Sequence, residues 1–89
     1  MKLDSKEANF LFQALVEIKN LEEAKMLLED LCTMGEIEAF IQRLQAAKRL
    51  LKGQTYDQIM QETDISSATL SRVSKCIRYG EGGYKTIID

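Results

Sequence analysis

The sequence lacks several residue types, and each absence narrows the classes of function. It has no histidine, no proline and no tryptophan, so the commonest general base and the commonest metal ligand are missing. Its two cysteines, Cys32 and Cys76, are too few and too far apart for a disulfide framework or a zinc site. No apolar run is long enough to span a membrane, and no leader for secretion opens the chain. We therefore expect a cytoplasmic protein with no metal and no membrane partner.

The length limits the size of any hydrophobic core. At 89 residues we expect the chain to form one domain at most. A domain of this size buries only about 60% of the surface that its unfolded chain exposes. The hydrophobic fraction of 45% nevertheless excludes intrinsic disorder. Such a chain folds around a thin core unless a second chain adds to it.

Apolar residues recur with the period of a helix, which predicts an all-α fold of five to six short helices. Residues that favour helix caps and helix ends lie at their expected boundaries. We expect helices over roughly 5–19, capped by Asp4 with Glu7; over 21–31, capped by Asn20; from Thr33 with Glu36 to about Lys52, ended by Gly53; from Thr55 to near Thr63; and over 67–79, capped by Ser66 and ended by Gly80. For residues 80–89, the C-terminal tail, a further helical turn and a frayed end both remain open.

The first predicted helix carries more apolar surface than one small chain can cover. Its apolar residues span roughly 240° of the helix circumference, whereas a surface helix needs a stripe somewhat wider than 100°. Phe10 and Leu15 can face the core of their own chain, but Phe12 and Val16 then point away from it. A bundle that surrounds this helix within one chain is one explanation. We favour a homodimer in which residues 1–53 supply the dimerisation helices.

The most specific pattern lies in residues 55–79. A short helix with Tyr56, Ile59 and Met60 on one face is followed by a tight turn, and a second helix then places Leu70 and Val73 inward. The turn residues are Asp64, which tolerates a left-handed conformation, Ile65, which fills the space between the helices, and Ser66, which caps the second helix. This order predicts a helix-turn-helix motif, in which the second helix enters the major groove of double-stranded DNA.

The predicted second helix exposes small and polar residues. Small side chains near its N-terminus permit close approach to base edges, and basic residues farther along can contact phosphates. Because this helix has no asparagine or glutamine, the preceding helix can supply amide groups for adenine. The candidate DNA-binding residues are Gln58, Gln61, Ser67, Ala68, Ser71, Lys75 and Arg78.

Charge is distributed unevenly along the chain, whose formal net charge is −2. Residues 1–31 carry four lysines against seven acidic residues, whereas residues 39–56 carry four basic residues and residues 65–80 three, both without any acidic residue. The whole-chain value conceals these two basic stretches. We expect Lys48, Arg49 and Lys52 to join Lys75 and Arg78 in salt-dependent phosphate binding.

The motif is compatible with a helical protein-interaction module that docks on the transcription machinery without touching DNA. An enzyme is disfavoured, because Cys76 has no histidine to pair with and the carboxylates lie on solvated helix faces.

The order of these motifs resembles the Trp repressor superfamily. The resemblance is carried by Thr33-Met34-Gly35-Glu36, by the helix through Arg43 to Gly53 and by Ala68-Thr69-Leu70-Ser71-Arg72. The segment from Tyr56 to Val73, with the late Tyr79-Gly80 and Gly83-Tyr84, is more similar to its YerC/YecD-like branch. The resemblance covers roughly residues 10–84. It implies an intertwined homodimer and a bacterial transcriptional regulator, a repressor as in the family, that reads a near-palindromic operator.

The resemblance also implies a small-molecule corepressor, tryptophan, held between two arginines. Thr33, Arg43 and Arg72 match the effector-pocket positions, although a phosphate contact or a salt bridge is the alternative role for Arg43. The chain departs from the pattern at Val73, where the family has glycine, and at Cys76, where it has serine. The joint between the two motif helices is also one residue shorter.

Overall fold

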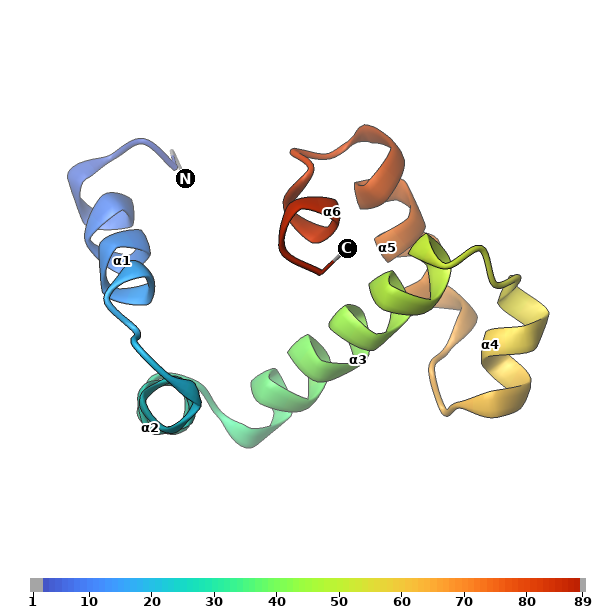
Figure 1. Cartoon of the computed structure of the whole chain (residues 1–89), viewed down its shortest axis with the longest axis horizontal. Coiled ribbons are helices and arrows are strands. Elements are labelled where there is room, and N and C mark those ends of the chain that lie inside the picture. Colours follow the sequence, from blue (N-terminus) through green and yellow to red (C-terminus); the bar gives the residue numbers. More distant parts are fainter. Residues whose placement is uncertain (1–2, 89) are drawn as a thin grey trace. The chain divides into compact units, whose positions relative to one another are not determined.

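A computed structural model describes residues 3–88, which form six α-helices and no strand (Figure 1). This confirms the expected all-α class. The helices are α1 (Lys6–Val16), α2 (Leu21–Leu31), α3 (Met34–Leu51), α4 (Tyr56–Glu62), α5 (Ser67–Tyr79) and α6 (Gly83–Ile88). The chain divides after Ile37 into two compact units, so that α3 begins in the first unit and continues through the second. None of the helices in the described residues has the length and apolar character needed to cross a membrane.

The first unit begins with a cap that differs from the predicted one. Ser5, not Asp4, is the N-cap of α1: its backbone is extended and its hydroxyl oxygen accepts a hydrogen bond from the Ala8 N–H at 3.1 Å. A serine hydroxyl satisfies the same unpaired amide that an aspartate would, and Ser5 stands three residues before that amide. The predicted cap of α2 is confirmed, because the Asn20 side chain accepts from the Glu23 N–H at 2.9 Å.

The apolar side chains of the first unit are largely exposed within one chain. Ala8 is the one buried residue that α1 and α2 contribute. Phe10 is 79% exposed, Val16 73% and Leu21 86%. The expectation that Phe10 faces the core of its own chain is therefore wrong, since this unit has no core large enough to receive an aromatic ring.

Two capping motifs fix the ends of α3. At its start, the Glu36 N–H donates to the Thr33 hydroxyl at 3.1 Å, and the Thr33 N–H donates to the Glu36 carboxylate at 2.8 Å. At its end, Gly53 adopts a left-handed φ of +89°, and the N–H groups of Gly53 and Gln54 donate to the carbonyl oxygens of Leu50 and Arg49. This pair of bonds is a Schellman motif, which needs a residue without a Cβ penalty at its left-handed position. Both predicted boundaries are confirmed.

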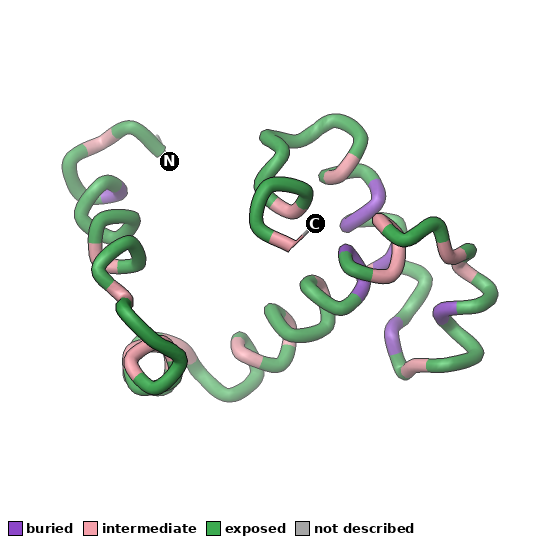
Figure 2. The backbone as a smooth tube through the Cα atoms, viewed as in Figure 1, coloured by how far each residue is buried: buried purple, intermediate pink, exposed green. Residues whose placement is uncertain are grey.

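The hydrophobic core of the second unit gathers residues from α3, α4, α5 and the turn between the last two helices (Figure 2). Its buried members are Ala46, Ala47, Ile59, Ile65, Leu70 and Val73. Because Ala46 and Ala47 have side chains of one carbon, they leave room beside α3 for the larger core residues of the other helices. The core therefore fixes the helix pair α4–α5 on the second half of α3.

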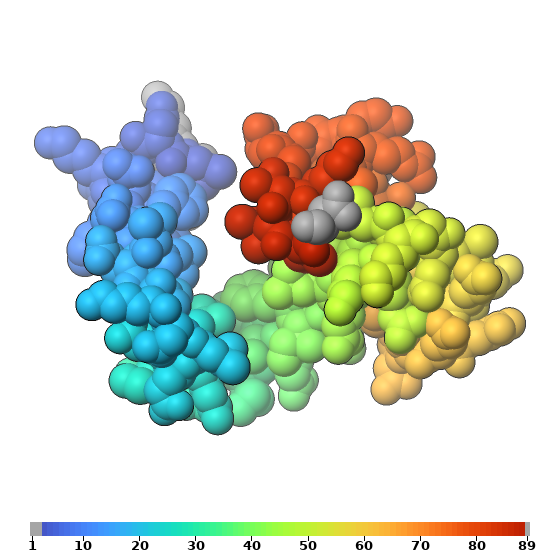
Figure 3. Space-filling model, in the orientation of Figure 1, coloured from blue at the N-terminus to red at the C-terminus, as the bar shows by residue number. Residues whose placement is uncertain are grey.

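The sequence left open whether the C-terminal tail is helical or frayed. Most of its residues form the helix α6. Tyr84 and Ile88 of α6 pack against the core of the second unit, and Figure 3 shows the residues of this helix in red next to the green residues of the second unit. Gly80 ends α5 as predicted, but its φ of −87° is not left-handed. Glycine is needed there because a Cβ would collide with the carbonyl oxygen of Cys76.

Replacing Leu70 by alanine should destabilise the fold by about 2–5 kcal/mol, because the substitution leaves a cavity in a core that holds α5 in place. The measurement is urea unfolding at a fixed protein concentration. Ser71→Ala, at the adjacent exposed position, is the control and should change the free energy of unfolding by no more than about 0.5 kcal/mol. Equal effects of the two substitutions would contradict the assignment of Leu70 to the core.

Candidate nucleic-acid interface

The helices α4 and α5 form the predicted helix-turn-helix. Ile59 of α4, Leu70 and Val73 of α5 and Ile65 of the turn are all buried. The Tyr56 hydroxyl of α4 also donates a hydrogen bond to the Leu70 carbonyl oxygen of α5 at 3.4 Å. The bounds of α5 coincide with the predicted range 67–79, and Ser66 caps it by accepting from the Thr69 N–H at 3.2 Å.

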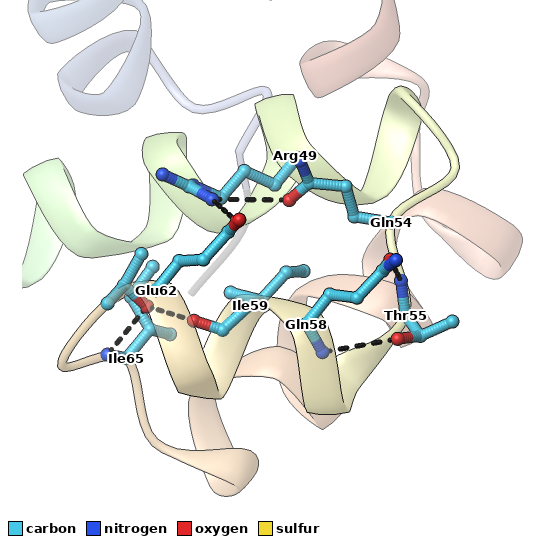
Figure 4. A network of polar contacts seen from close by, with 8 residues as sticks. Arg49, Gln54, Thr55, Gln58, Ile59, Glu62 and Ile65 are labelled. Carbon is cyan, nitrogen blue, oxygen red and sulfur yellow. Dashed lines mark hydrogen bonds and ion pairs between the residues drawn. The ribbon is translucent and has the colours of Figure 1, made fainter.

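The turn between α4 and α5 has a different geometry from the predicted one. Asp64 does not adopt a left-handed conformation, and no residue other than glycine does so in the described chain. The chain instead leaves α4 through an extended Thr63, with φ −141° and ψ 171°. The Thr63 hydroxyl donates to the Ile59 carbonyl oxygen at 2.7 Å and accepts from the Ile65 N–H at 3.1 Å (Figure 4). This one hydroxyl makes a left-handed residue unnecessary.

Met60 does not share the buried face of α4. It is 45% exposed, while Ile59 is fully buried and Tyr56 is half-buried. Its predicted inward position is therefore wrong.

The predicted reading surface of α5 is exposed. Ser67, Ala68, Ser71 and Lys75 all lie on the solvent side of the helix, opposite the buried Leu70 and Val73. A shallow groove follows this outer face and is lined by Ala68, Ser71, Arg72, Lys75, Cys76, Tyr79 and Gly80. The exposed side chains are thus small near the start of α5, which suits contact with base edges. Farther along the helix they are basic, which suits contact with phosphates.

The two candidate glutamines of α4 differ in whether their side chains are already hydrogen-bonded within the chain. Both are exposed. The Gln58 carboxamide oxygen accepts from the Thr55 N–H at 2.9 Å, while the Gln58 N–H donates to the Thr55 hydroxyl at 3.2 Å. This reciprocal capping box occupies one lone pair of the Gln58 carboxamide oxygen and leaves both side-chain N–H groups free to donate to a ligand. Gln61 makes no side-chain hydrogen bond within the described residues.

The predicted phosphate-binding residues also fall into two groups. Lys48, Lys52 and Lys75 are exposed, and Arg78 is exposed while it donates to the Ser74 hydroxyl at 3.1 Å. Arg49 is different, because its guanidinium forms a 2.7 Å ion pair with the Glu62 carboxylate. The predicted role of Arg49 in phosphate binding stays a prediction, and the Nη1 atom of its guanidinium is engaged within the chain. Sequence inspection missed this pair because its members lie thirteen positions apart, outside any helical spacing.

The three candidate effector residues have separate environments. Thr33 is an exposed residue of the first unit, and its hydroxyl caps α3 by accepting a hydrogen bond from the Glu36 N–H. Arg43 of α3 is half-buried, and Arg72 of α5 is exposed along the groove described above. Neither arginine forms a salt bridge within residues 3–88. The assignment of these residues to an effector pocket stays a prediction.

The fold and the exposed face of α5 define the class of the protein, a small all-α helix-turn-helix protein. The chain belongs to the Trp repressor protein family, whose pattern matches residues 6–89. Because this family consists of regulatory DNA-binding proteins, the chain is placed among regulators and not among enzymes. No group of residues that could hold a metal ion occurs in the described part of the chain.

Relatives in sequence and structure agree with this assignment. The chain is 43% identical over 88 residues to the uncharacterised protein YerC of Bacillus subtilis strain 168, covering 99% of this chain and 85% of YerC. A TrpR-like protein from Eubacterium eligens has a similar crystal structure, with a TM-score of 0.89 and 40% identity over 96% of this chain and 88% of its own. A Staphylococcus aureus protein provisionally assigned as a Trp repressor gives a TM-score of 0.91 at 38% identity, covering 100% of this chain and 92% of its own.

Replacing Thr63 by valine should destabilise the fold by about 1–3 kcal/mol, because the Ile65 N–H loses its partner and is left unsatisfied near the core. Valine keeps the branched shape, so the loss reports on the hydroxyl alone. The measurement is denaturant unfolding. Thr63→Ser retains the hydroxyl and serves as the control, and a serine variant as unstable as the valine variant would contradict the role given to the two hydrogen bonds.

Proposed function

We propose that the protein is a homodimeric transcription regulator, a repressor in the sense of its family, that binds a near-palindromic DNA operator. In this proposal α5 of each protomer enters the major groove. The two α5 helices then read half-sites whose centres lie about 34 Å apart, one helical turn of DNA. The observation that carries the proposal is the exposed face of α5 on a rigid support.

The start of α5 supports base contact. Its exposed residues Ser67, Ala68 and Ser71 have at most two side-chain heavy atoms each, so the helix backbone can approach the base edges closely. Serine hydroxyls both donate and accept hydrogen bonds, and the alanine methyl group suits the methyl group of thymine. With few long side chains for direct readout, water-mediated contacts and DNA shape contribute to specificity.

The cationic residues support backbone contact. Lys75 and Arg78 follow the small residues along α5, and Lys48 and Lys52 lie exposed near the end of α3. Phosphate contacts from such side chains release counterions and give an affinity that falls as the salt concentration rises. They orient the protein on the duplex without selecting a sequence.

The apolar surface of the first unit supports a homodimer. Phe10, Val16 and Leu21 are each more than 70% exposed in the single chain. Burying a side chain of this kind contributes about 1.5–3 kcal/mol, so a partner that covers several of them gains enough to offset the entropy of association. In the second unit, Phe40, Ile41 and Leu44 of α3 add further partly exposed apolar surface.

Tryptophan binding has less support than DNA binding. Val73, which stands where the family has a glycine after the second arginine, is fully buried in the core. Cys76, which stands where the family has a serine, is exposed along α5. The proposal therefore concerns the operator and the dimer, and it does not depend on tryptophan as a corepressor.

Introducing a carboxylate on the proposed reading face should abolish DNA binding. Ser71→Glu and Ser67→Glu each place a negative charge beside the phosphates in both protomers. We expect a loss of at least about 100-fold in affinity, because like charges brought together cost several kcal/mol and 1.4 kcal/mol is tenfold. The measurement is a titration of an operator selected from a random DNA pool.

Thr86→Glu is the matched control, because it introduces the same charge at an exposed position of α6, outside the proposed reading face. It should bind the operator with nearly the affinity of the unaltered protein. Selection of no DNA sequence by the unaltered protein would refute the proposal and favour a protein-interaction module.

The mass in solution tests the dimer separately from DNA. At micromolar concentration, light scattering should give twice the 10.1 kDa protomer mass. Phe10→Asp should weaken association by at least about tenfold, since it loses the burial of an aromatic ring. Asn9→Asp introduces the same carboxylate at the adjacent exposed residue and should leave the mass unchanged. A protomer mass for the unaltered protein would overturn the dimer.

A further inference from the structure

Arg49 connects three successive parts of the second unit. It lies on the last turns of α3, and its Nη1 atom donates to the Glu62 carboxylate at the end of α4, at 2.7 Å. The same nitrogen donates to the carboxamide oxygen of Gln54 in the loop between these helices, at 3.2 Å. Figure 4 shows the three side chains converging from α3, the loop and α4. We refer to Arg49, Gln54 and Glu62 as the α3–α4 clamp.

The apolar contacts of α4 lie in its first turn and its middle, and its last turn has none. This helix has seven residues, and Ile59 is its one fully buried side chain. Tyr56 also packs against the core, so the last turn, where Gln61 and Glu62 are exposed, is the part of α4 that the core does not hold. Tyr56 restrains its first turn through the hydrogen bond to Leu70, but that bond joins α4 to α5 and not to α3.

The clamp supplies the missing attachment to α3. Glu62 lies one turn beyond Ile59 and is tied to Arg49. The other end of α4 is held by the loop, where the Schellman motif at Gly53 is followed directly by the capping box of Thr55 and Gln58. With its start, its middle and its end each attached, α4 has one direction relative to the second half of α3.

The direction of α4 on α3 matters for reading two half-sites. Phe40, Ile41 and Leu44 present partly exposed apolar surface on α3, while Ala46 and Ala47, farther along the same helix, support α4 and α5. One helix thus carries both the surface offered to a partner and the base of the reading motif. A pivot of α4, which moves α5 with it, would change the separation of the two α5 helices in a dimer.

We propose that Arg49 and Glu62 act as positioning residues that set the half-site spacing the dimer accepts. This inference rests on the proposed function. It differs from the role in phosphate binding that the sequence predicted for Arg49, because the guanidinium is directed to a carboxylate of its own chain. Lys48 and Lys52 remain as the exposed cations of this segment.

The test uses full-length protein and a set of operators that share the selected half-sites and differ in spacing by single base pairs. Each added base pair moves a half-site by about 3.4 Å and rotates it around the duplex. The unaltered protein should prefer one spacing. Arg49→Glu and Glu62→Arg should each lower that preference by at least about threefold, and the charge-swapped double variant should restore it to within about twofold.

Two matched controls separate positioning from the effect of charge on DNA binding. Lys48→Glu makes the charge change of Arg49→Glu at the next residue of α3, and Asp57→Arg makes that of Glu62→Arg on α4. Both positions are exposed and unpaired in the described chain. These controls should alter the affinity at all spacings alike and leave the preferred spacing unchanged.

The outcomes distinguish this inference from the proposed function. If the unaltered protein selects no operator, the proposed function fails and the inference fails with it. If it selects an operator but the single variants retain the spacing preference, only the clamp inference is overturned. A double variant that folds, as shown by its helical circular dichroism and its mass, but does not regain the preference overturns it as well and returns Arg49 to phosphate contact.

Discussion

The second unit depends on the contact that two alanine methyl groups make with three larger side chains. Ala46 and Ala47 are fully buried in α3, and Ile59, Leu70 and Val73 lie in the same core. A longer side chain at either alanine would force α4 and α5 away from α3, because a close-packed core has no room for extra atoms. The exposed face of α5 is therefore oriented by the smallest residues of the core, which themselves never reach the surface.

Local chemistry explains which parts of this arrangement the sequence predicted. Ser66 and Gly53 act on backbone groups a few residues away, so their roles and the bounds of α5 follow from spacing alone. The conformation of the turn after α4 could not be predicted in this way. The hydroxyl of Thr63 forms hydrogen bonds with backbone groups on both sides of it and removes the need for a left-handed Asp64. The Arg49–Glu62 pair was not predicted, because these residues are distant in sequence and come together only when the loop between α3 and α4 folds.

The same pair changes what the charge pattern means. The basic stretch 39–56 has no acidic residue in sequence, yet in the fold Glu62 meets Arg49 and neutralises part of it. A count of charges along the chain reflects only which residues are adjacent in sequence. The attraction of a phosphate instead depends on which charges lie close to it in the folded protein. The exposed cations Lys48, Lys52, Arg72, Lys75 and Arg78 form no ion pair within the described residues and are the part of the pattern that remains available to DNA.

The first unit poses a different physical problem, because it contributes a single buried alanine and exposes its aromatic and aliphatic residues. Helices of eleven residues such as α1 and α2 are marginal alone in water and need packing to persist. In the proposed dimer that packing comes from the partner, so folding of this unit and association become one equilibrium that depends on protein concentration. Since α3 runs from this unit into the helix-turn-helix support, the helix that association stabilises is also the helix on which α5 is mounted. In the proposed dimer, a shared helix of this kind couples association to the orientation of α5.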